Sequence, residues 1–254
     1  MSKTSKKIII ANWKMNPGRV SDATALAKKI ERAAAAGRGA EIVVAPPFPF
    51  LAAVGSVLKK ARLGAQDVFW EHAGPYTGEV SALQLASVGV GYVIVGHSER
   101  KINLGETDEM AAKKVAAVVG AGMTAILCIG ERHRTGSDIP PEVGAQLART
   151  LSAVKRPLLK NLIVCYEPVW AISTMPDSRP ATPDDAFRAV VYIRKIIADR
   201  FGSAAGRAAR VIYGGSVNAK NIASFLGEGG MEGALVGAVS LEAREFSRLV
   251  GSIV

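Results

Sequence analysis

The sequence predicts an α/β protein whose eight parallel strands close into a (β/α)8 barrel, and three observations support this prediction. Eight short, β-branched apolar runs recur along the 254 residues, at 7–11, 41–45, 62–66, 91–95, 124–129, 162–166, 210–213 and 233–236. Runs that are apolar on both faces are typical of buried parallel strands. Segments with helical periodicity separate them. The count of eight favours a barrel over a doubly wound sheet, and no G-x-G-x-x-G motif follows the first run.

Apolar residues at helical spacing predict the helices between these strands. The predicted buried stripes are Val20, Ala23, Ala27, Ile30 and Ala34; Val143, Leu147, Leu151 and Val154; Phe187, Val190, Val191, Arg194 and Ile197; and Leu241, Phe246, Leu249 and Ile253. The third stripe follows Thr182, Pro183, Asp184 and Asp185. A capping Thr, a Pro in the first turn and two early acids favour a helix start there.

Composition narrows the class of protein. We expect one domain over residues 1–254, because no linker or low-complexity segment interrupts the pattern. The chain has 32 basic and 22 acidic residues, but the basic residues are scattered, so we expect no nucleic acid and no membrane partner. We expect neither a signal peptide nor a membrane span, since no segment resembles the former and no apolar run reaches ~18 residues. Cys128 and Cys165 lie in apolar runs, which indicates reduced core thiols of a cytoplasmic protein and no metal site.

Polar residues follow the predicted strands where barrel enzymes carry their chemistry. Lys14 follows the first strand, His97 the fourth and Glu167 the sixth, and glycine-rich turns follow the last two strands. A Glu at the end of a buried strand can act as a base, a His can polarise a carbonyl, and a Lys can stabilise negative charge. Gly-rich turns offer backbone N–H groups to a phosphate. Together these residues indicate proton abstraction beside a carbonyl on a small phosphorylated substrate.

Each of these residues also has a structural interpretation when taken alone. Glu167 could pair with a basic residue, His97 could be a hydrogen-bonded core residue, and Lys14 could be a solvated surface charge. Glu99 and Glu106 are expected to hold neighbouring groups through ion pairs. His72 and His133 do not accompany other candidate site residues, and they are expected on the surface.

Seven short motifs, in order from the first strand to the last, resemble the triosephosphate isomerase family. They are NWKMN at 12–16, GAQD at 64–67, YTGE at 76–79, GHSER at 96–100, CIGE at 128–131, YEPVWAI at 166–172 and YGGSVN at 213–218. The resemblance implies a TIM barrel that interconverts dihydroxyacetone phosphate and glyceraldehyde 3-phosphate in glycolysis and gluconeogenesis, with no cofactor and no metal. It also implies a homodimer, in which the loop around Thr77 lies beside Asn12 and Lys14 of the partner subunit.

The resemblance also implies roles for individual residues. Glu167 resembles the base, His97 the neutral electrophile, and Lys14 the charge that stabilises the enediolate, with Glu99 as an orienting group. Binding of the substrate would involve Asn12 and Lys14 together with the backbone donors Ser173, Ser216, Gly237 and Ala238. Residues 168–170 resemble the near hinge of a lid, and this family is a standard example of lid closure.

Two departures from the family pattern keep alternatives open. Residues 173–181 are about three longer than the family's short glycine-rich lid and contain two prolines, and Ala238 replaces a glycine. The longer lid leaves open an isomerase of a longer sugar phosphate, such as a tetrulose phosphate. A phosphate-binding barrel without catalysis is the other alternative, and the presence of Glu167 argues against it.

Overall fold

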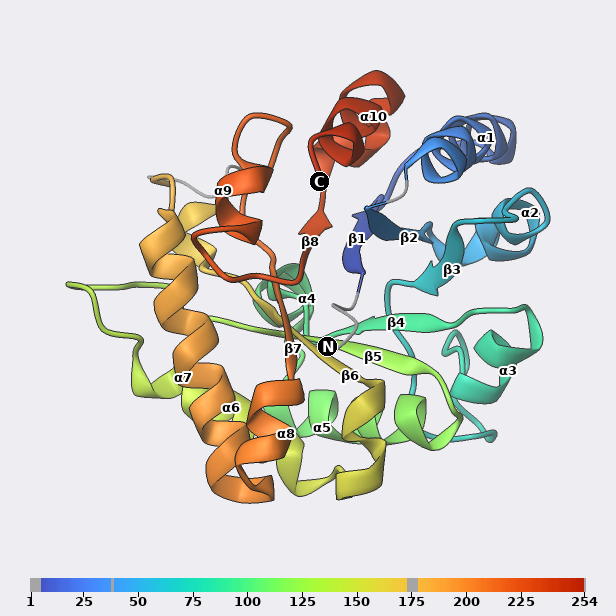
Figure 1. Cartoon of the computed structure of the whole chain (residues 1–254). Helices are drawn as coiled ribbons and strands as arrows, with labels where there is room; N and C mark the ends of the chain where they lie inside the picture. The colour runs from blue at the N-terminus through green and yellow to red at the C-terminus, as the bar shows by residue number, and fades with distance from the viewer. Residues whose placement is uncertain (1–5, 38, 173–177, 254) are drawn as a thin grey trace.

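The computed structural model describes residues 6–37, 39–172 and 178–253, and its strands form a closed parallel barrel (Figure 1). Neighbouring strands follow chain order, and β1 pairs with both β2 and β8, which closes the sheet. The strands are β1 (Lys7–Asn12), β2 (Ala40–Ala45), β3 (Arg62–Ala65), β4 (Tyr92–Val95), β5 (Thr124–Ile129), β6 (Leu162–Tyr166), β7 (Arg210–Tyr213) and β8 (Gly233–Val236). The predicted α/β class and (β/α)8 barrel are confirmed.

Successive strand residues alternate between two cores. In β1, Ile8 and Ile10 belong to a cluster inside the barrel, whereas Ile9 and Ala11 pack outward in the larger cluster shared with the helices. The interior cluster is Ile8, Ile10, Val43, Ala45, Ile94, Ile126, Cys128, Ile163, Cys165, Ile212 and Leu235. Burial on both faces explains why each strand is a nearly continuous apolar run.

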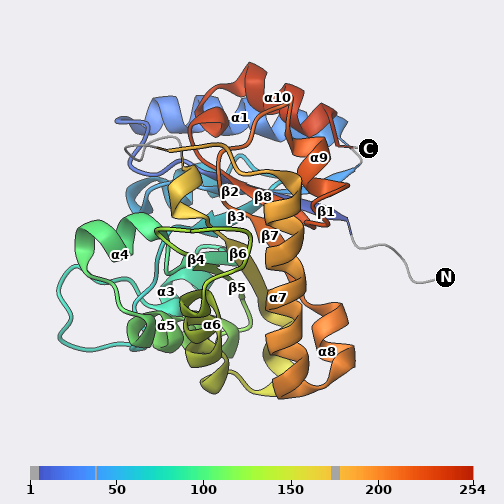
Figure 2. The same ribbon diagram turned by 90° about the vertical axis from the view of Figure 1, so that its left-hand side faces the viewer.

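Helices surround the strands, and Figure 2 shows α1 and α10 side by side on one flank of the barrel. The α-helices are α1 (Val20–Ala36), α2 (Leu51–Gly55), α3 (Ala82–Ser87), α4 (Ser98–Leu104), α5 (Asp108–Gly120), α6 (Pro141–Ser152), α7 (Pro183–Phe201), α8 (Ser203–Ala208), α9 (Ile222–Leu226) and α10 (Ala243–Gly251). Short 3-10 helices are η1 (Phe48–Phe50), η2 (Arg156–Asn161), η3 (Val169–Ala171) and η4 (Ala238–Leu241). Among the described residues, no helix combines the length and apolar character that a membrane span requires.

The start of α7 confirms the capping prediction, but the predicted buried face of this helix is partly wrong. Thr182 caps the helix in a reciprocal arrangement with Asp185. Phe187 and Val191, predicted to be buried, are 48% and 51% exposed. The helix instead buries Ala186, Ala189, Val190, Ile193 and Ile197. The prediction favoured bulky side chains, whereas small alanines allow the helix to lie close to the barrel. Val20, predicted in the first stripe, is also exposed because it is the first residue of α1.

Candidate active site

Lys14 follows β1 in a left-handed backbone conformation, with a φ of 53°. This conformation is uncommon for residues other than glycine, so neighbouring groups must hold it. The Lys14 N–H donates to Asn12 Oδ1 at 3.0 Å, and Gln66 Nε2 donates to the Lys14 carbonyl at 2.8 Å. Asn12 and Gln66 therefore fix the direction in which the Lys14 side chain leaves the barrel rim.

The Lys14 ammonium pairs with a carboxylate from the first turn of α4, the helix that follows β4. Its Nζ lies 2.5 Å from Glu99 Oε1, and the two side chains are 28% and 42% exposed. An ion pair that is open to solvent contributes little to stability. The positive charge of Lys14 can therefore be shared with an anion that enters from solvent.

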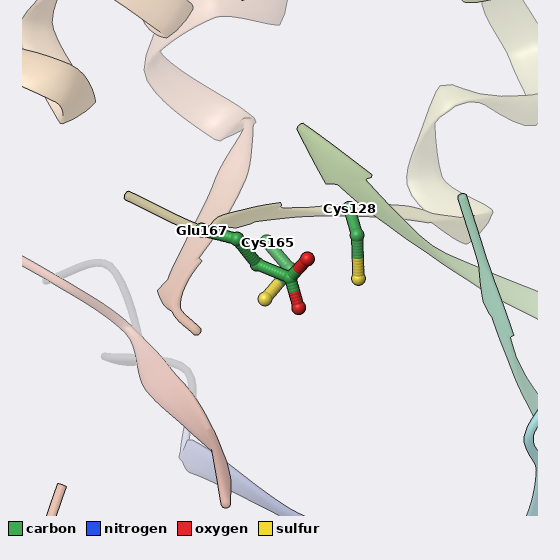
Figure 3. Close-up of side chains that lie close together, drawn as sticks. All are labelled: Cys128, Cys165 and Glu167. Carbon is green, nitrogen blue, oxygen red and sulfur yellow. The ribbon is translucent and has the colours of Figure 1, made fainter. Parts of the chain in front are cut away.

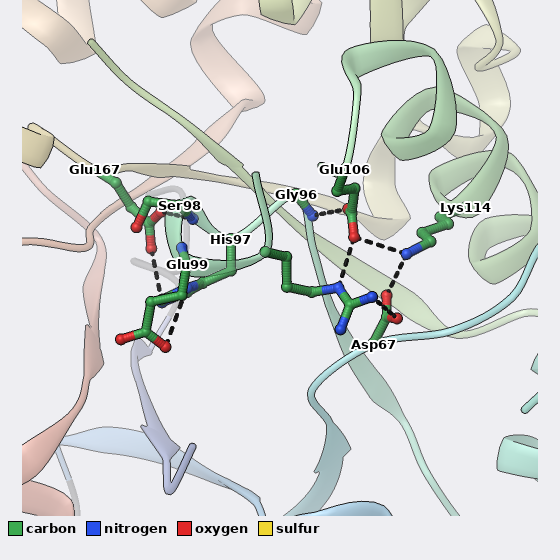
Figure 4. Close-up of polar contacts among 9 residues, drawn as sticks. Asp67, Gly96, His97, Ser98, Glu99, Glu106, Lys114 and Glu167 are labelled. Carbon is green, nitrogen blue, oxygen red and sulfur yellow. Dashed lines mark hydrogen bonds and ion pairs between the residues drawn. The ribbon is translucent and has the colours of Figure 1, made fainter. Parts of the chain in front are cut away.

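His97 lies at the N-cap of α4, directly after β4. Its Nδ1 accepts a hydrogen bond from the Glu99 N–H at 3.2 Å. An accepting Nδ1 carries no proton, so this bond assigns the neutral ring with its proton on Nε2. Nε2 lies 3.3 Å from Glu167 Oε1, as Figure 4 shows. The imidazole is therefore placed to donate a hydrogen bond beside the carboxylate.

Glu167 follows β6 and is 2% exposed. Its Oε2 accepts a hydrogen bond from the Ser98 N–H at 2.9 Å. Oε1 makes no hydrogen bond within the described part of the chain, and its distance to His97 Nε2 is 3.3 Å. Gly214 gives the side chain room, since a Cβ there would lie 2.6 Å from Glu167 Cγ. The result is a buried carboxylate with one oxygen available for proton transfer.

Most of the predicted site residues line one cavity of about 380 Å³. These are Asn12, Lys14, His97, Ser216, Gly237 and Ala238. Gly237 and Ala238 lie at the start of η4, directly after β8. The structure therefore brings these side chains and turns together around one cavity. The predicted Ser173 lies outside the described residues.

Glu167 lines a different cavity, of about 280 Å³, which it shares with Ser98 and Cys128. The described lining of the larger cavity does not include Glu167. The carboxylate thus contacts the ring of His97 without facing the space that Lys14 faces. Sequence analysis did not predict this separation, because it depends on the side-chain conformation of Glu167 and on its bond to Ser98.

Glu131 anchors the segment that follows Glu167. This buried carboxylate accepts hydrogen bonds at Oε1 from the Tyr166 hydroxyl at 2.7 Å and from Trp170 Nε1 at 2.9 Å. On the far side of residues 173–177, the Arg179 N–H donates to the Trp170 carbonyl at 3.1 Å, and the guanidinium lies 4.2 Å from the Trp170 ring centroid. Ser216 also reaches this segment, because its hydroxyl donates to the Ala171 carbonyl at 3.1 Å.

A second group of charged residues lies beside the first, and we call it the buried ion-pair cluster: Asp67, Arg100, Glu106 and Lys114. Asp67, Glu106 and Lys114 are buried, and Arg100 is partly exposed at the edge of the cluster. Lys114 Nζ lies 2.7 Å from both Asp67 Oδ1 and Glu106 Oε2. Arg100 pairs with the same two carboxylates at 2.8 and 2.6 Å. Glu106 Oε1 accepts the Gly96 N–H at 2.9 Å, and the φ of 73° at Gly96 suits glycine. The expected ion pairs of Glu99 and Glu106 are both confirmed.

Three residues that position the site were not assigned a role by sequence analysis. Gln66 holds the Lys14 backbone, Glu131 holds the Trp170 segment, and the Ser98 N–H holds Glu167. All three residues lie within short motifs, at 64–67, 96–100 and 128–131. These motifs were the only sign in the sequence that the residues have a role in the site. His72 and His133 are exposed, as predicted.

Comparison with known proteins agrees with this geometry. A family model described as triosephosphate isomerase matches residues 7–253. The chain is 40% identical over 249 residues to a protein named triosephosphate isomerase from Thermoanaerobacter sp. strain X514, covering 96% of this chain and 98% of that protein. It is 39% identical to proteins of the same name from Geotalea uraniireducens, over 96% and 98% of the two chains, and from Saccharopolyspora erythraea, over 95% and 94%. On this evidence, the chain belongs to the triosephosphate isomerase family.

Proposed function

We propose that this chain interconverts dihydroxyacetone phosphate and D-glyceraldehyde 3-phosphate through an enediolate, a step of glycolysis and gluconeogenesis. The observation that carries the proposal is the placement of Lys14, His97 and the turns after β7 and β8 around one cavity, with Glu167 Oε1 3.3 Å from His97 Nε2. A base, an electrophile, a fixed cation and phosphate-binding turns are the groups that this isomerisation needs. Family membership supports the same assignment.

Glu167 is the base in the proposed mechanism. It removes the proton from the carbon next to the carbonyl and returns it to the neighbouring carbon. His97, with its proton on Nε2, donates a hydrogen bond to the carbonyl oxygen and moves protons between the two oxygens. Lys14 stabilises the negative charge of the enediolate and of the phosphate. The proton count balances, because the proton removed from one carbon is the one delivered to the other or its exchanged equivalent from solvent.

The carboxylate of Glu167 must change position for this role. It is held by the Ser98 N–H and lines the smaller cavity, whereas Lys14 and His97 line the larger one. We infer that entry of the substrate breaks the bond to Ser98 and that the carboxylate turns past His97 into the larger cavity. A single backbone hydrogen bond is a modest barrier to this movement.

The phosphate is proposed to bind at the turns that follow β7 and β8. Ser216, Gly237 and Ala238 line the larger cavity there, and barrel enzymes frequently bind phosphate at this place beside a short extra helix, here η4. Ala238 can serve in place of a glycine because the donor belongs to the main chain. Ser173 is proposed to add a further backbone donor when the lid closes.

A coupled assay on the purified protein tests the proposal. We expect turnover of glyceraldehyde 3-phosphate, and a kcat/KM that is higher for the three-carbon phosphates than for a tetrulose phosphate. A clear preference for the four-carbon substrate would favour the longer-sugar isomerase. Absence of turnover, together with phosphate binding, would favour the non-catalytic barrel.

A homodimer formed through the loop around Thr77 is also proposed. Residues 71–79 are all exposed, and Tyr76 in this loop is 42% exposed. Near the catalytic lysine, Met15 is 91% exposed, and Leu104 at the end of α4 is 66% exposed. In the proposed dimer these residues belong to one apolar interface, since a contiguous exposed apolar patch marks an interaction site. Sedimentation should give a dimer, and Thr77→Arg should give a monomer; a monomeric wild-type protein would refute this proposal.

We propose the cytoplasm as the compartment and one domain over residues 1–254. Cys128 and Cys165 are both free thiols, which suits a reducing compartment. Pairing of β1 with β8 joins the two ends of the chain in one barrel, which supports a single domain.

A further inference from the structure

Two thiols and the proposed base lie close together at the carboxyl-terminal end of β5 and β6. Cys128 in β5 and Cys165 in β6 are register partners, and both are fully buried. One ligand atom from each cysteine and one carboxylate oxygen of Glu167 all lie within 4.8 Å of one another. Figure 3 shows the carboxylate directed toward the two sulfur atoms.

The positions of the two cysteines do not favour a disulfide bond between them. Side chains of register partners in neighbouring parallel strands stand side by side, about 4.8 Å apart. A disulfide requires the two Cβ atoms to approach to about 3.8 Å. The strands would have to move together to form the bond, and the closed barrel opposes such movement.

A bridging cation fits the same geometry better. Zinc with Zn–S bonds of about 2.3 Å in a tetrahedron places its two sulfur ligands about 3.8 Å apart, within the separation of the cluster. A carboxylate oxygen of Glu167 is the third donor. Oε1 of this carboxylate is buried without a hydrogen bond among the described residues. A fourth position would remain for water, as in zinc sites with three protein ligands.

We propose that Cys128, Cys165 and Glu167 form an inhibitory site for a thiophilic divalent cation of the Zn²⁺ and Cd²⁺ class. Binding releases one proton from each thiol to solvent and forms two metal–sulfur bonds and one metal–oxygen bond, with no change of oxidation state. The bound cation holds Glu167 among the sulfurs, so its carboxylate cannot turn into the substrate cavity. The inhibitory consequence rests on the proposed role of Glu167 as the base, whereas binding of the metal does not.

The smaller cavity offers an approach to the site. Its lining includes Cys128 and Glu167 together with the exposed residues Arg132 and His133, whereas Cys165 is not part of the described lining. The proposed entry of the cation is through this cavity, which reaches two of the three ligands. Burial raises the pKa of both thiols, so the metal must displace their protons. Sequence analysis interpreted the two cysteines as reduced core thiols and expected no metal site, and the proposal departs from that expectation.

Titration with Cd²⁺ tests binding without any reference to catalysis. We expect ultraviolet charge-transfer absorption from cadmium–thiolate bonds that saturates at one cation per chain, and a cadmium NMR shift typical of two sulfur ligands. Cys165→Ala should weaken binding at least about tenfold, because one ligand is lost. The NMR measurement uses the wild-type protein and remains decisive if the variant fails to fold. Absence of the absorption, or its persistence unchanged in folded Cys165→Ala, would overturn the site.

Inhibition is then measured on the same proteins. Preincubation with Zn²⁺ should inhibit the wild-type isomerase, a chelator should restore it, and Cys165→Ala should need at least about tenfold more Zn²⁺ for half inhibition. His133→Ala is the matched control, because it removes a possible ligand from the mouth of the same cavity; it should stay as sensitive as the wild type. Loss of inhibition in His133→Ala would overturn the assignment. The coupling enzyme is tested separately with the same metal.

The two measurements separate failure of the metal site from failure of the proposed function. Cadmium–thiolate absorption in a protein without isomerase activity would uphold the site and refute the function. An active isomerase without this absorption would uphold the function and refute the metal site. An active isomerase that binds Cd²⁺ through both sulfurs but keeps its full rate in excess metal would refute the inhibitory role.

Discussion

Two groups of charged residues meet at α4, to which each contributes one residue. They differ in how completely their polar atoms are paired. The first is Lys14, His97, Glu99 and Glu167, which we call the catalytic cluster after its proposed role; the second is the buried ion-pair cluster. Glu99 and Arg100 are adjacent on α4 but belong to different clusters (Figure 4). In the buried ion-pair cluster, two cations contact two carboxylates at 2.6–2.8 Å.

The catalytic cluster is less completely paired. Its Lys14–Glu99 pair is half-exposed, and Glu167 Oε1 has only a 3.3 Å approach to His97. Charges that are fully paired and buried hold a structure in place, because removing one partner leaves the others without compensation. Charges with unused capacity can accept a substrate. The difference indicates that similar residue types, one position apart in the chain, are suited to the proposed catalysis or to stability according to what remains unpaired.

The largest effect is expected for Glu167→Gln. The substitution keeps the shape of the side chain and removes the base, so kcat should fall about 10³- to 10⁴-fold. The free energy of unfolding should change much less, because the amide can still accept the Ser98 N–H. Steady-state kinetics and urea denaturation measure the two effects. Near-normal turnover would return Glu167 to a structural role.

A smaller loss of activity is expected for Lys14→Met, which keeps the length of the side chain and removes its charge. The kcat/KM should fall about 10²- to 10³-fold, because the enediolate and phosphate lose a fixed cation. Both kcat and KM should change. An effect limited to thermal stability would assign Lys14 to the structure alone.

In the buried ion-pair cluster, Glu106→Gln should act mainly on stability. The change leaves Lys114 and Arg100 with one carboxylate, Asp67, and should cost about 3 kcal/mol in the free energy of unfolding. The kcat/KM of the folded protein should change less than in Lys14→Met. If Glu106→Gln instead abolishes turnover at full stability, the division between the two clusters is wrong.

The pH dependence of stability sharpens the same comparison. Burial acts to raise the pKa of Glu106, but its contacts with Lys114 and Arg100 outweigh burial and place the pKa below the ordinary 4.5. A carboxyl with a lowered pKa in the folded state stabilises the protein above about pH 4.5, and this contribution is lost as pH falls through the folded pKa. The stability difference between wild type and Glu106→Gln should therefore be largest near neutral pH and shrink in acid.

The pKa of Asp67, in the same cluster, shifts in the opposite direction from that of Glu106. Burial raises the pKa of its carboxyl despite the nearby Lys114. The acid profile of the wild type thus sums two opposed contributions. Glu106→Gln removes the first and also takes from Asp67 a neighbouring carboxylate that helps to raise its pKa. A stability difference that grows as the pH falls below about 4.5 would contradict the assignment for Glu106.

The smallest effect is expected for Asp199→Asn in α7. Its carboxylate pairs with Lys195 at 2.8 Å, but the side chains are 70% and 64% exposed. Water and salt screen such a pair, so the denaturation midpoint should not move beyond experimental scatter. A loss comparable to that of Glu106→Gln would show that burial does not govern the contribution of ion pairs here.

Most of the fold could be predicted from sequence because the strands are buried on both faces. Their continuous apolar runs located the boundaries closely; β5, β6, β7 and β8 begin and end at the predicted residues. Helix faces were harder to predict. In α7, Ala186 and Ala189 face the barrel while Phe187 does not, since close packing of small residues decided the orientation.

The catalytic cluster could be predicted only as a set of strand ends. Parallel strands bring Lys14 and His97 to one rim, and both line one cavity. Two hydrogen bonds depend on backbone direction and side-chain conformation. They are the bond from Gln66 to the Lys14 carbonyl and the bond from the Ser98 N–H to Glu167. These details follow from the folded geometry of the loops, which short motifs do not specify.

The most direct test of the central claim is a crystal structure with the triose phosphate bound. The account predicts that the Glu167 carboxylate leaves the Ser98 N–H and lies about 3 Å from the reacting carbons, while Lys14 and His97 contact the oxygens of the same molecule. A carboxylate that stays on Ser98, separated from the bound substrate by more than one bridging water, would contradict it.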